Sequence, residues 1–132
     1  MTVEDAITSA ELILPGEAAP DGEVDARWQA IIEVSEFIKT EPDAVWSFAR
    51  RWGAHADKDL RTAISPCVLE HLLEYHFDSF IARVEEAARE EPLFADTVTG
   101  CWKLGQAEEP IRAARFDRLL ASIRKLKGRR HR

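Results

Sequence analysis

The sequence predicts an all-α fold, an antiparallel helical array of about six helices that is loosely HEAT-like. Strand signals are almost absent, because no run of alternating β-branched residues and no Asn-Gly or Asp-Gly hairpin turn occurs. Apolar residues instead recur at helical spacing, and most prolines stand where helices would begin. Three Glu-Pro pairs precede expected helices and indicate stacked helix pairs, although their offsets are too irregular for a sequence repeat: Glu41-Pro42, Glu91-Pro92 and Glu109-Pro110.

Three segments are expected along the 132 residues of the chain. Residues 1–21 are expected to form a short N-terminal helix, over about 3–13, and a linker rich in Pro and Gly. Residues 22–127 form the α-helical domain, because an apolar content of 45% is enough to build one core without metals or disulfides. Residues 128–132 form a basic tail.

The first helix of the domain lies within residues 24–40 and ends before Pro42. The second has Pro42 in its first turn and stops at Gly53, and a short helical turn follows over residues 56–64. The last two helices begin at Pro92 and Pro110, and the first of these is expected to run almost to residue 105.

Two further helix starts are expected in the middle of the chain. Ser65 is suited to an N-cap with Pro66 at the first helical position, and Asp78 is suited to capping the next helix. In that helix Glu85 and Arg89 are expected to form a solvent-side i,i+4 ion pair. The residues expected in the structural core are Trp28, Trp46, Leu72, Leu73, Ile81 and Trp102. Any tryptophan that is exposed instead would be the best available interface anchor.

Charge is distributed unevenly along the chain. Residues 1–102 contain 8 Lys and Arg against 21 Asp and Glu, whereas residues 103–132 contain 10 against 3. This polarity indicates either an interaction tail or the packing of a basic helix on an acidic bundle.

The acidic N-terminus does not resemble a signal peptide, and no segment approaches the roughly 18 apolar residues of a membrane span. A cytoplasmic protein with no membrane partner is expected. The 13 arginines against 5 lysines, with no asparagine, are typical of a bacterial genome of high GC content.

The stretch LEHLLEYH places two histidines and two glutamates within two helical turns. On a regular helix His71 and His76 diverge by about 140°, so one metal ion cannot be held by both. Glu70 and Glu74 share a side of the helix, and neither is matched there by a histidine. The two cysteines lack CxxC spacing, and no phosphate-binding loop or nucleophile motif occurs. No enzyme, cofactor or metal is therefore expected, and a metal-dependent enzyme is the least favoured alternative.

The C-terminal run IRKLKGRRHR is the one segment that suggests nucleic acid. The acidic body would repel phosphate, and no aromatic residue interleaves the basic run, so nucleic-acid binding is disfavoured. A nucleic-acid-associated accessory protein that uses this tail remains the alternative function.

Two stretches resemble an uncharacterised bacterial family, domain of unknown function 6869, over about residues 26–104: EPDAVWSFARRW and SPCVLEHLLEYHFDSFIARVEEAAREEPLFADTVTGCW. The matching positions are Trp28, Trp46, Glu70, Leu72, Leu73, His76, Ile81, Glu85, Pro92 and Trp102. Against the family pattern, Cys67-Val68 is inserted after the Ser65-Pro66 start, and Phe77 replaces a glycine. The family has no established activity, so the resemblance implies helices, structural roles for Glu70 and His76, and no reaction.

The leading hypothesis is a non-catalytic bacterial protein-interaction module, of which a toxin-neutralising, immunity-type protein is one form. It depends on the acidic body, the small helical array and the lack of a catalytic set. The expected partner is a basic protein, and the candidate interface residues are Glu86, Glu90 and Trp52.

Overall fold

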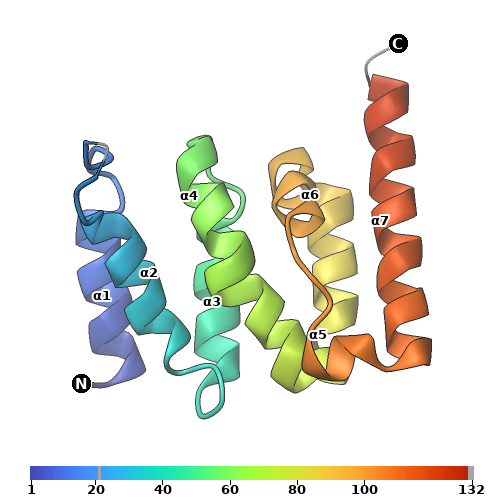
Figure 1. Cartoon of the computed structure of the whole chain (residues 1–132), viewed down its shortest axis with the longest axis horizontal. Coiled ribbons are helices and arrows are strands. Elements are labelled where there is room, and N and C mark those ends of the chain that lie inside the picture. Colours follow the sequence, from blue (N-terminus) through green and yellow to red (C-terminus); the bar gives the residue numbers. More distant parts are fainter. Residues whose placement is uncertain (21, 131–132) are drawn as a thin grey trace.

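The computed structural model describes residues 1–20 and 22–130, and these residues form helices with no strand among them (Figure 1). In chain order the helices are α1 (Val3–Ile13), α2 (Ala26–Ser35), α3 (Pro42–Trp52), α4 (Lys58–Ile64), α5 (Glu70–Glu90), α6 (Pro92–Thr99) and α7 (Pro110–Arg130). Two short elements accompany them, the π-helical segment η1 (Ser65–Leu69) and the 3-10 helix η2 (Gly105–Glu108). The predicted all-α array is confirmed. Residues 131–132 of the expected tail lie outside the described residues.

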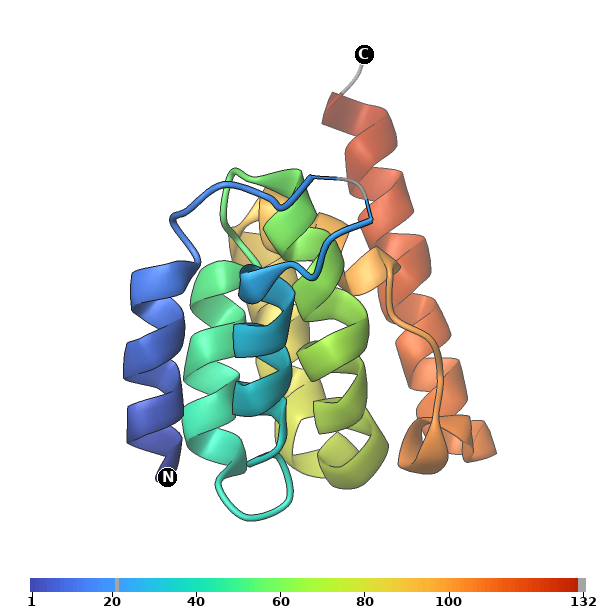
Figure 2. The same cartoon turned by 60° about the vertical axis from the view of Figure 1, so that its left-hand side comes forward.

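The helices stand side by side from α1 at one end of the molecule to α7 at the other (Figure 1, Figure 2). The chain reverses direction at each step from α1 to α6, and α4, η1 and α5 form one continuous step. Helices α6 and α7 are parallel, which differs from the antiparallel prediction. Residues 100–109 run in the direction opposite to α6, and α7 then points the same way as α6 (Figure 1). This returning segment creates the surface that carries the candidate site.

One apolar core runs through the array, and its largest fully buried side chains include Phe77, Phe80, Phe94 and Phe116. Trp46 packs against this core, with its ring centroid 6.0 Å from Phe80 and 5.8 Å from Phe94. Helix α1 contributes four buried side chains, Val3, Ala6, Ala10 and, at its C-cap, Leu14. The core therefore begins with α1, ahead of the boundary expected at residue 22.

Arg27 joins α2 to α4 through a guanidinium group buried in the protein, the whole residue being 2% exposed. Its Nη1 donates to Asp57 at 3.0 Å and its Nη2 donates to Asp59 at 2.5 Å, while its backbone N–H donates to the N-cap residue Asp25. Burial opposes the charge on Asp57, but hydrogen bonds from the Asp59 N–H and from Arg27 outweigh it and lower the pKa of Asp57. The same balance of burial against hydrogen bonds from Arg27 lowers the pKa of Asp25. This ion cluster fixes two helices that the sequence separates by 30 residues.

The prediction that Ser65 caps a new helix is wrong, because α4 continues through η1 directly into α5. Pro66 lies inside this run, where its ring would clash with the carbonyl four residues earlier in a regular α-helix. The wider π turn separates the proline from that carbonyl and lets the helix continue. Ser65 instead turns its hydroxyl toward Cys101, with 3.5 Å between Oγ and Sγ.

The helix break expected near residue 77 exists as a kink inside α5, where His76 has φ −140° and ψ 43°. Asp78 does not cap it. The side chain of Gln106 does, because its Oε1 accepts from the Phe77 N–H at 2.9 Å and its Nε2 donates to the Tyr75 carbonyl at 2.8 Å. One amide thereby pairs a donor and an acceptor on either side of the kink.

Gln106 is therefore expected to stabilise the kink. Replacing Gln106 by alanine should lower the free energy of unfolding by about 1 kcal/mol, since two backbone groups lose their partner. The measurement is a urea titration followed by circular dichroism. Gln106→Glu keeps the acceptor for Phe77 and loses the donor to Tyr75, so it should show a smaller loss. Equal stability of all three proteins would contradict this role.

Helix α7 packs on the acidic α5 through ion pairs rather than leaving its charge to solvent. Arg112 donates two hydrogen bonds to Asp78, at 3.0 and 2.9 Å, and Arg115 donates two to Glu85, at 3.2 and 2.8 Å. The expected pair of Glu85 with Arg89 is therefore wrong, because the Glu85 carboxylate turns toward α7. Part of the basic C-terminal charge thus holds the helix on the acidic bundle.

Candidate functional site

Trp102 is 76% exposed, so its expected place in the core is wrong. Helix α6 ends at Thr99 with Gly100 as its C-cap, and the chain beyond is no longer helical. The inward position is taken by Cys101, which is 8% exposed, and the next side chain therefore points outward. The prediction that Trp52 belongs to an interface is also wrong. Its side chain is 4% exposed and belongs to the core.

The other residues expected in the core are buried or partly buried, and the other two expected at an interface are exposed. Leu72, Leu73 and Ile81 are buried, and Trp28 and Trp46 are partly buried against the core. Glu86 and Glu90 are exposed on α5, and Glu90 forms an ion pair with Arg50 at 3.0 Å.

Two close contacts hold the backbone around Trp102. The buried carboxylate of Glu70, at the start of α5, accepts the Trp102 N–H at 3.0 Å. Gly100 lies so close to η1 that a Cβ there would be 2.6 Å from the Ser65 Oγ. The indole is therefore presented from an anchored backbone, and Glu70 has the structural role that the sequence indicated.

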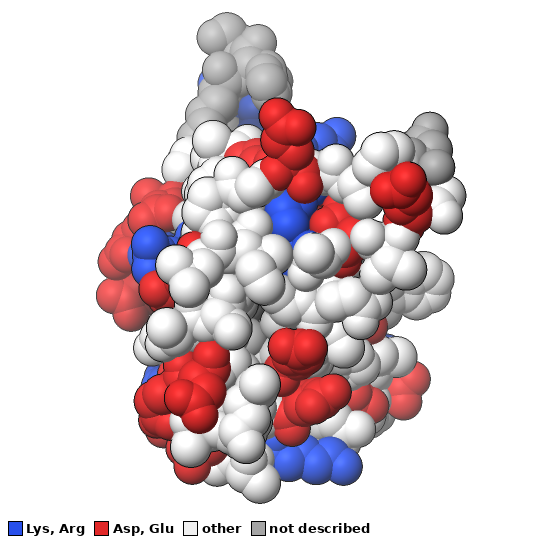
Figure 3. All heavy atoms as spheres, turned by 90° about the vertical axis from the view of Figure 1, so that its left-hand side faces the viewer, with Lys and Arg blue, Asp and Glu red and all other residues white. Residues whose placement is uncertain are grey.

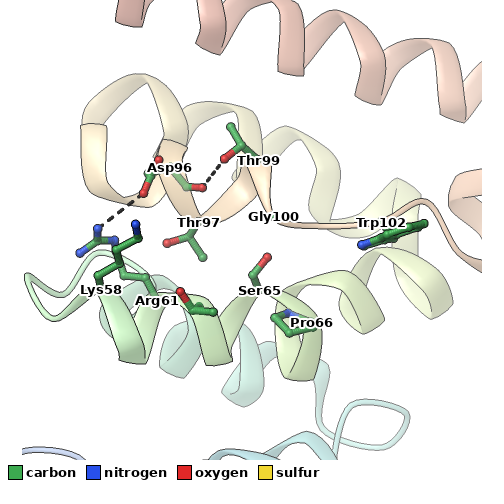
Figure 4. Close-up of a pocket in the computed structure, with 10 residues that line it drawn as sticks. Lys58, Arg61, Ser65, Pro66, Asp96, Thr97, Thr99, Gly100 and Trp102 are labelled. Carbon is green, nitrogen blue, oxygen red and sulfur yellow. Dashed lines mark hydrogen bonds and ion pairs between the residues drawn. The ribbon is translucent and has the colours of Figure 1, made fainter.

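A hollow of about 400 Å³ separates α4 and η1 from α6, with Trp102 at one end (Figure 4). Its lining side chains are short hydroxyl-bearing residues, one proline and a group of charges at the far end. The lining residues are Lys58, Arg61, Thr62, Ser65, Pro66, Asp96, Thr97, Thr99, Gly100 and Trp102. A second hollow of about 340 Å³ lies between the returning segment and α7, and Trp102 lines it together with Lys103, Asp117 and Arg124.

The charges at the far end of the first hollow bind one another. Asp96 accepts from Lys127 at 2.6 Å and from Arg61 at 3.5 Å. The hydrogen bond from Lys127, aided by Arg61 and opposed by burial, lowers the pKa of Asp96. The largely buried Arg61 also donates to the carbonyls of His55 and Ala56, each at 2.9 Å. These contacts tie α4, α6 and α7 together.

Other residues with reactive side chains have structural contacts. Burial raises the pKa of the Cys101 thiol to about 12, so it stays protonated at neutral pH. His71 lies 2.6 Å from Glu74, which corrects the expectation that neither glutamate is matched by a histidine. His76 contacts the Ile38 carbonyl at 2.9 Å, at the edge of the core. Within residues 1–20 and 22–130, no three His, Cys, Asp or Glu side chains group as metal ligands would.

The family profile of DUF6869, a family of unknown function, matches residues 17–123. The chain belongs to this family. Comparison with curated proteins found no match, and comparison with solved structures found none either. Across the described helices of this DUF6869 protein, none is long and apolar enough to cross a membrane.

The Cys67-Val68 pair, which the sequence resemblance set apart from the family pattern, lies within η1. Its neighbours Ser65 and Pro66 line the first hollow, whereas Val68 is fully buried. The sequence did not indicate that Lys58 and Arg124 line the same hollows as Trp102, because they come from α4 and α7. One usable signal was present. Gly100 ends a Pro-begun helix, and a helix that stops there cannot keep Trp102 on its apolar face.

Proposed function

We propose that this DUF6869 protein is a non-catalytic protein-interaction module whose partner docks on Trp102. The observation that supports this proposal is a tryptophan 76% exposed between two hollows. Tryptophan is enriched among the residues that dominate binding energy, because it combines a large apolar surface with a polar N–H. Leu12, Val24 and Ile111 are similarly exposed, but none of them lines either hollow.

The polar groups that line the first hollow support binding over catalysis. Arg61 and Asp96 bind each other and neighbouring helices, and Thr97 donates to the Gly53 carbonyl at 2.5 Å. Groups that hold the fold together in this way are poorly placed to transfer protons or attack a substrate. A toxin-neutralising protein is one form of such a module, with the toxin as the partner that covers Trp102.

One observation favours the nucleic-acid alternative. Arg124 of the basic helix α7 lines the same hollow as Trp102, so the fold supplies the aromatic ring that the basic tail lacks in sequence. The experiment that tests the interaction module therefore has to detect protein partners and nucleic-acid partners alike.

Photo-crosslinking in bacterial cells tests the proposal. A photoreactive amino acid at position 102 is expected to join the protein to one specific partner protein, identified by mass spectrometry. The matched control is the same amino acid at Leu12, which is 81% exposed and distant in sequence. Adducts with nucleic acid at position 102, or the same set of proteins from both positions, would contradict the proposal.

With that partner purified, Trp102→Ala should weaken binding about 30-fold, which corresponds to the roughly 2 kcal/mol of an interface hot spot. Ile111→Ala, at a residue 78% exposed, should change affinity less than about twofold. Isothermal titration calorimetry measures both. If Glu86→Lys with Glu90→Lys weakens binding while Trp102→Ala does not, the interface is the acidic surface of α5 that the sequence suggested.

A further inference from the structure

In the two hollows that Trp102 lines, the carboxylates have ion-pair partners and two of the cations have none among the described residues. Asp96 and Asp117, the carboxylates that line its two hollows, are both bound by cations, Asp96 by two of them and Asp117 by Lys103 at 2.6 Å. Lys58 and Arg124 also line these hollows and form no ion pair within the described chain. Positive charge that no carboxylate of the site neutralises therefore remains in both hollows, from Lys58 at the far end of the first and from Arg124 in the second.

The two acidic neighbours of Lys58 in sequence do not compensate it. Asp57 and Asp59 both turn toward Arg27, at 3.0 and 2.5 Å, on the side of α4 that faces α2. Lys58 itself is exposed and lines the first hollow, between α4 and α6. Its charge is consequently available to a ligand that extends from Trp102 along the first hollow.

We propose that the partner docks with a short acidic peptide segment, with an apolar side chain against Trp102 and carboxylates at Lys58 and Arg124. This inference rests on the proposed function and reverses the charge of partner that the sequence suggested. Hollows of about 400 and 340 Å³ lie at the lower end of the roughly 300–1,000 Å³ of ligand pockets. They suit one or two inserted side chains of a peptide.

The rest of the surface limits how long this acidic ligand can be. The end of the array formed by α1 and α2 is rich in Asp and Glu side chains (Figure 3). Residues 1–102 as a whole contain 21 acidic against 8 basic residues. A long polyanion that extends toward that end is repelled, whereas a peptide confined to the Trp102 surface meets mainly cations. Charge complementarity thus favours an acidic peptide over a nucleic-acid strand that extends toward α1 and α2, and the oligonucleotides in the experiment below test a strand that follows the basic α7.

A random peptide display library, selected on the immobilised full-length protein, tests this proposal. Enriched peptides should carry an aromatic or large aliphatic residue flanked by Asp or Glu, and Trp102→Ala should abolish their binding. A synthetic peptide of the enriched sequence then provides affinities by fluorescence anisotropy. Lys58→Glu with Arg124→Glu should weaken it at least tenfold at low salt, and this difference should shrink as salt is raised.

The matched control is Arg118→Glu with Lys125→Glu, two exposed residues of α7 that line neither hollow. It changes the net charge equally and should alter affinity less than twofold, which separates a local contact from a general charge effect. Circular dichroism confirms that both double variants fold.

Other binding results would contradict particular parts of the proposal. Enrichment of basic peptides that depend on Trp102 would overturn the acidic segment and leave the interaction module standing. Equal losses in the two double variants would overturn the local contacts at Lys58 and Arg124. If no peptide depends on Trp102 while a fluorescent 20-nucleotide oligo(dT) or oligo(U) does, both the acidic segment and the module are wrong. Absence of any Trp102-dependent peptide or oligonucleotide binding would also overturn the acidic segment.

Discussion

Replacing Trp46 by alanine is expected to lower the free energy of unfolding by about 3 kcal/mol, whereas Trp102→Ala should change it by less than about 1 kcal/mol. Trp46 packs against Phe80 and Phe94 at the core, and removing its ring leaves a cavity beside both. The Trp102 ring is mostly in water, and its backbone contact with Glu70 survives the substitution. Guanidinium titrations followed by circular dichroism measure both changes.

Phenylalanine variants serve as controls for this comparison. Trp46→Phe retains an aromatic ring at the core and should lose less stability than Trp46→Ala. Trp102→Phe should match the wild-type protein. A loss of 3 kcal/mol for Trp102→Ala would show that the indole stabilises the fold and would remove the main support for a binding role.

Replacing Arg27 by methionine is expected to lower the free energy of unfolding by about 3 kcal/mol at pH 7. The substitution keeps much of the side-chain volume but leaves Asp25, Asp57 and Asp59 without the cation that they share. Removing one partner of a buried ion pair is costly because the remaining charges stay partly desolvated. The side chains of Asp57 and Asp59 are 39% and 48% exposed, which keeps the loss at the lower end of the range for buried pairs.

The stability lost on replacing Arg27 by methionine is expected to become smaller at acidic pH. The pKa values of Asp25 and Asp57 are lowered in the folded protein, from an ordinary value of 3.8. Their ion pairs therefore stabilise the fold above pH 3.8, and this stabilisation disappears as the pH falls through the lower folded values. The difference between wild-type and Arg27→Met proteins should thus be constant above about pH 5 and shrink as the pH falls below 3.8. Urea titrations across this range would show an unchanged difference if Arg27 acted only through packing.

Helix positions followed from the sequence because their signals are local. The prolines at residues 42, 92 and 110 lie in the first turns of α3, α6 and α7, as expected. Exposure was harder to infer for single side chains. Trp52 and Trp102 are chemically alike and both stand near the end of a helix that begins with proline, yet one is buried and the other is in water. Their difference depends on where the helix ends and which element packs against it.

Long-range contacts account for the rest of what the sequence did not indicate. Gln106 caps a kink about 30 residues earlier in the chain, and Arg27 binds carboxylates about 30 residues later. Neither contact has a spacing rule that relates one residue to the other. The candidate site has the same character, because Lys58 of α4, Trp102 of the returning segment and Arg124 of α7 are far apart in sequence and line two adjoining hollows.

The π turn η1 also affects how preorganised the proposed binding site is. An unbroken α-helix would turn about 900° over the nine residues from Leu60 to Leu69, and would put these leucines on opposite sides. The wider π turn reduces this rotation, and both leucines are buried, Leu60 in α4 and Leu69 in η1. The wall opposite Trp102 is therefore hydrogen-bonded helix from Lys58 onward, with no loop to order. A peptide that docked there, as we propose, would meet a preorganised helical wall, and its affinity would not be reduced by the entropy of ordering that wall.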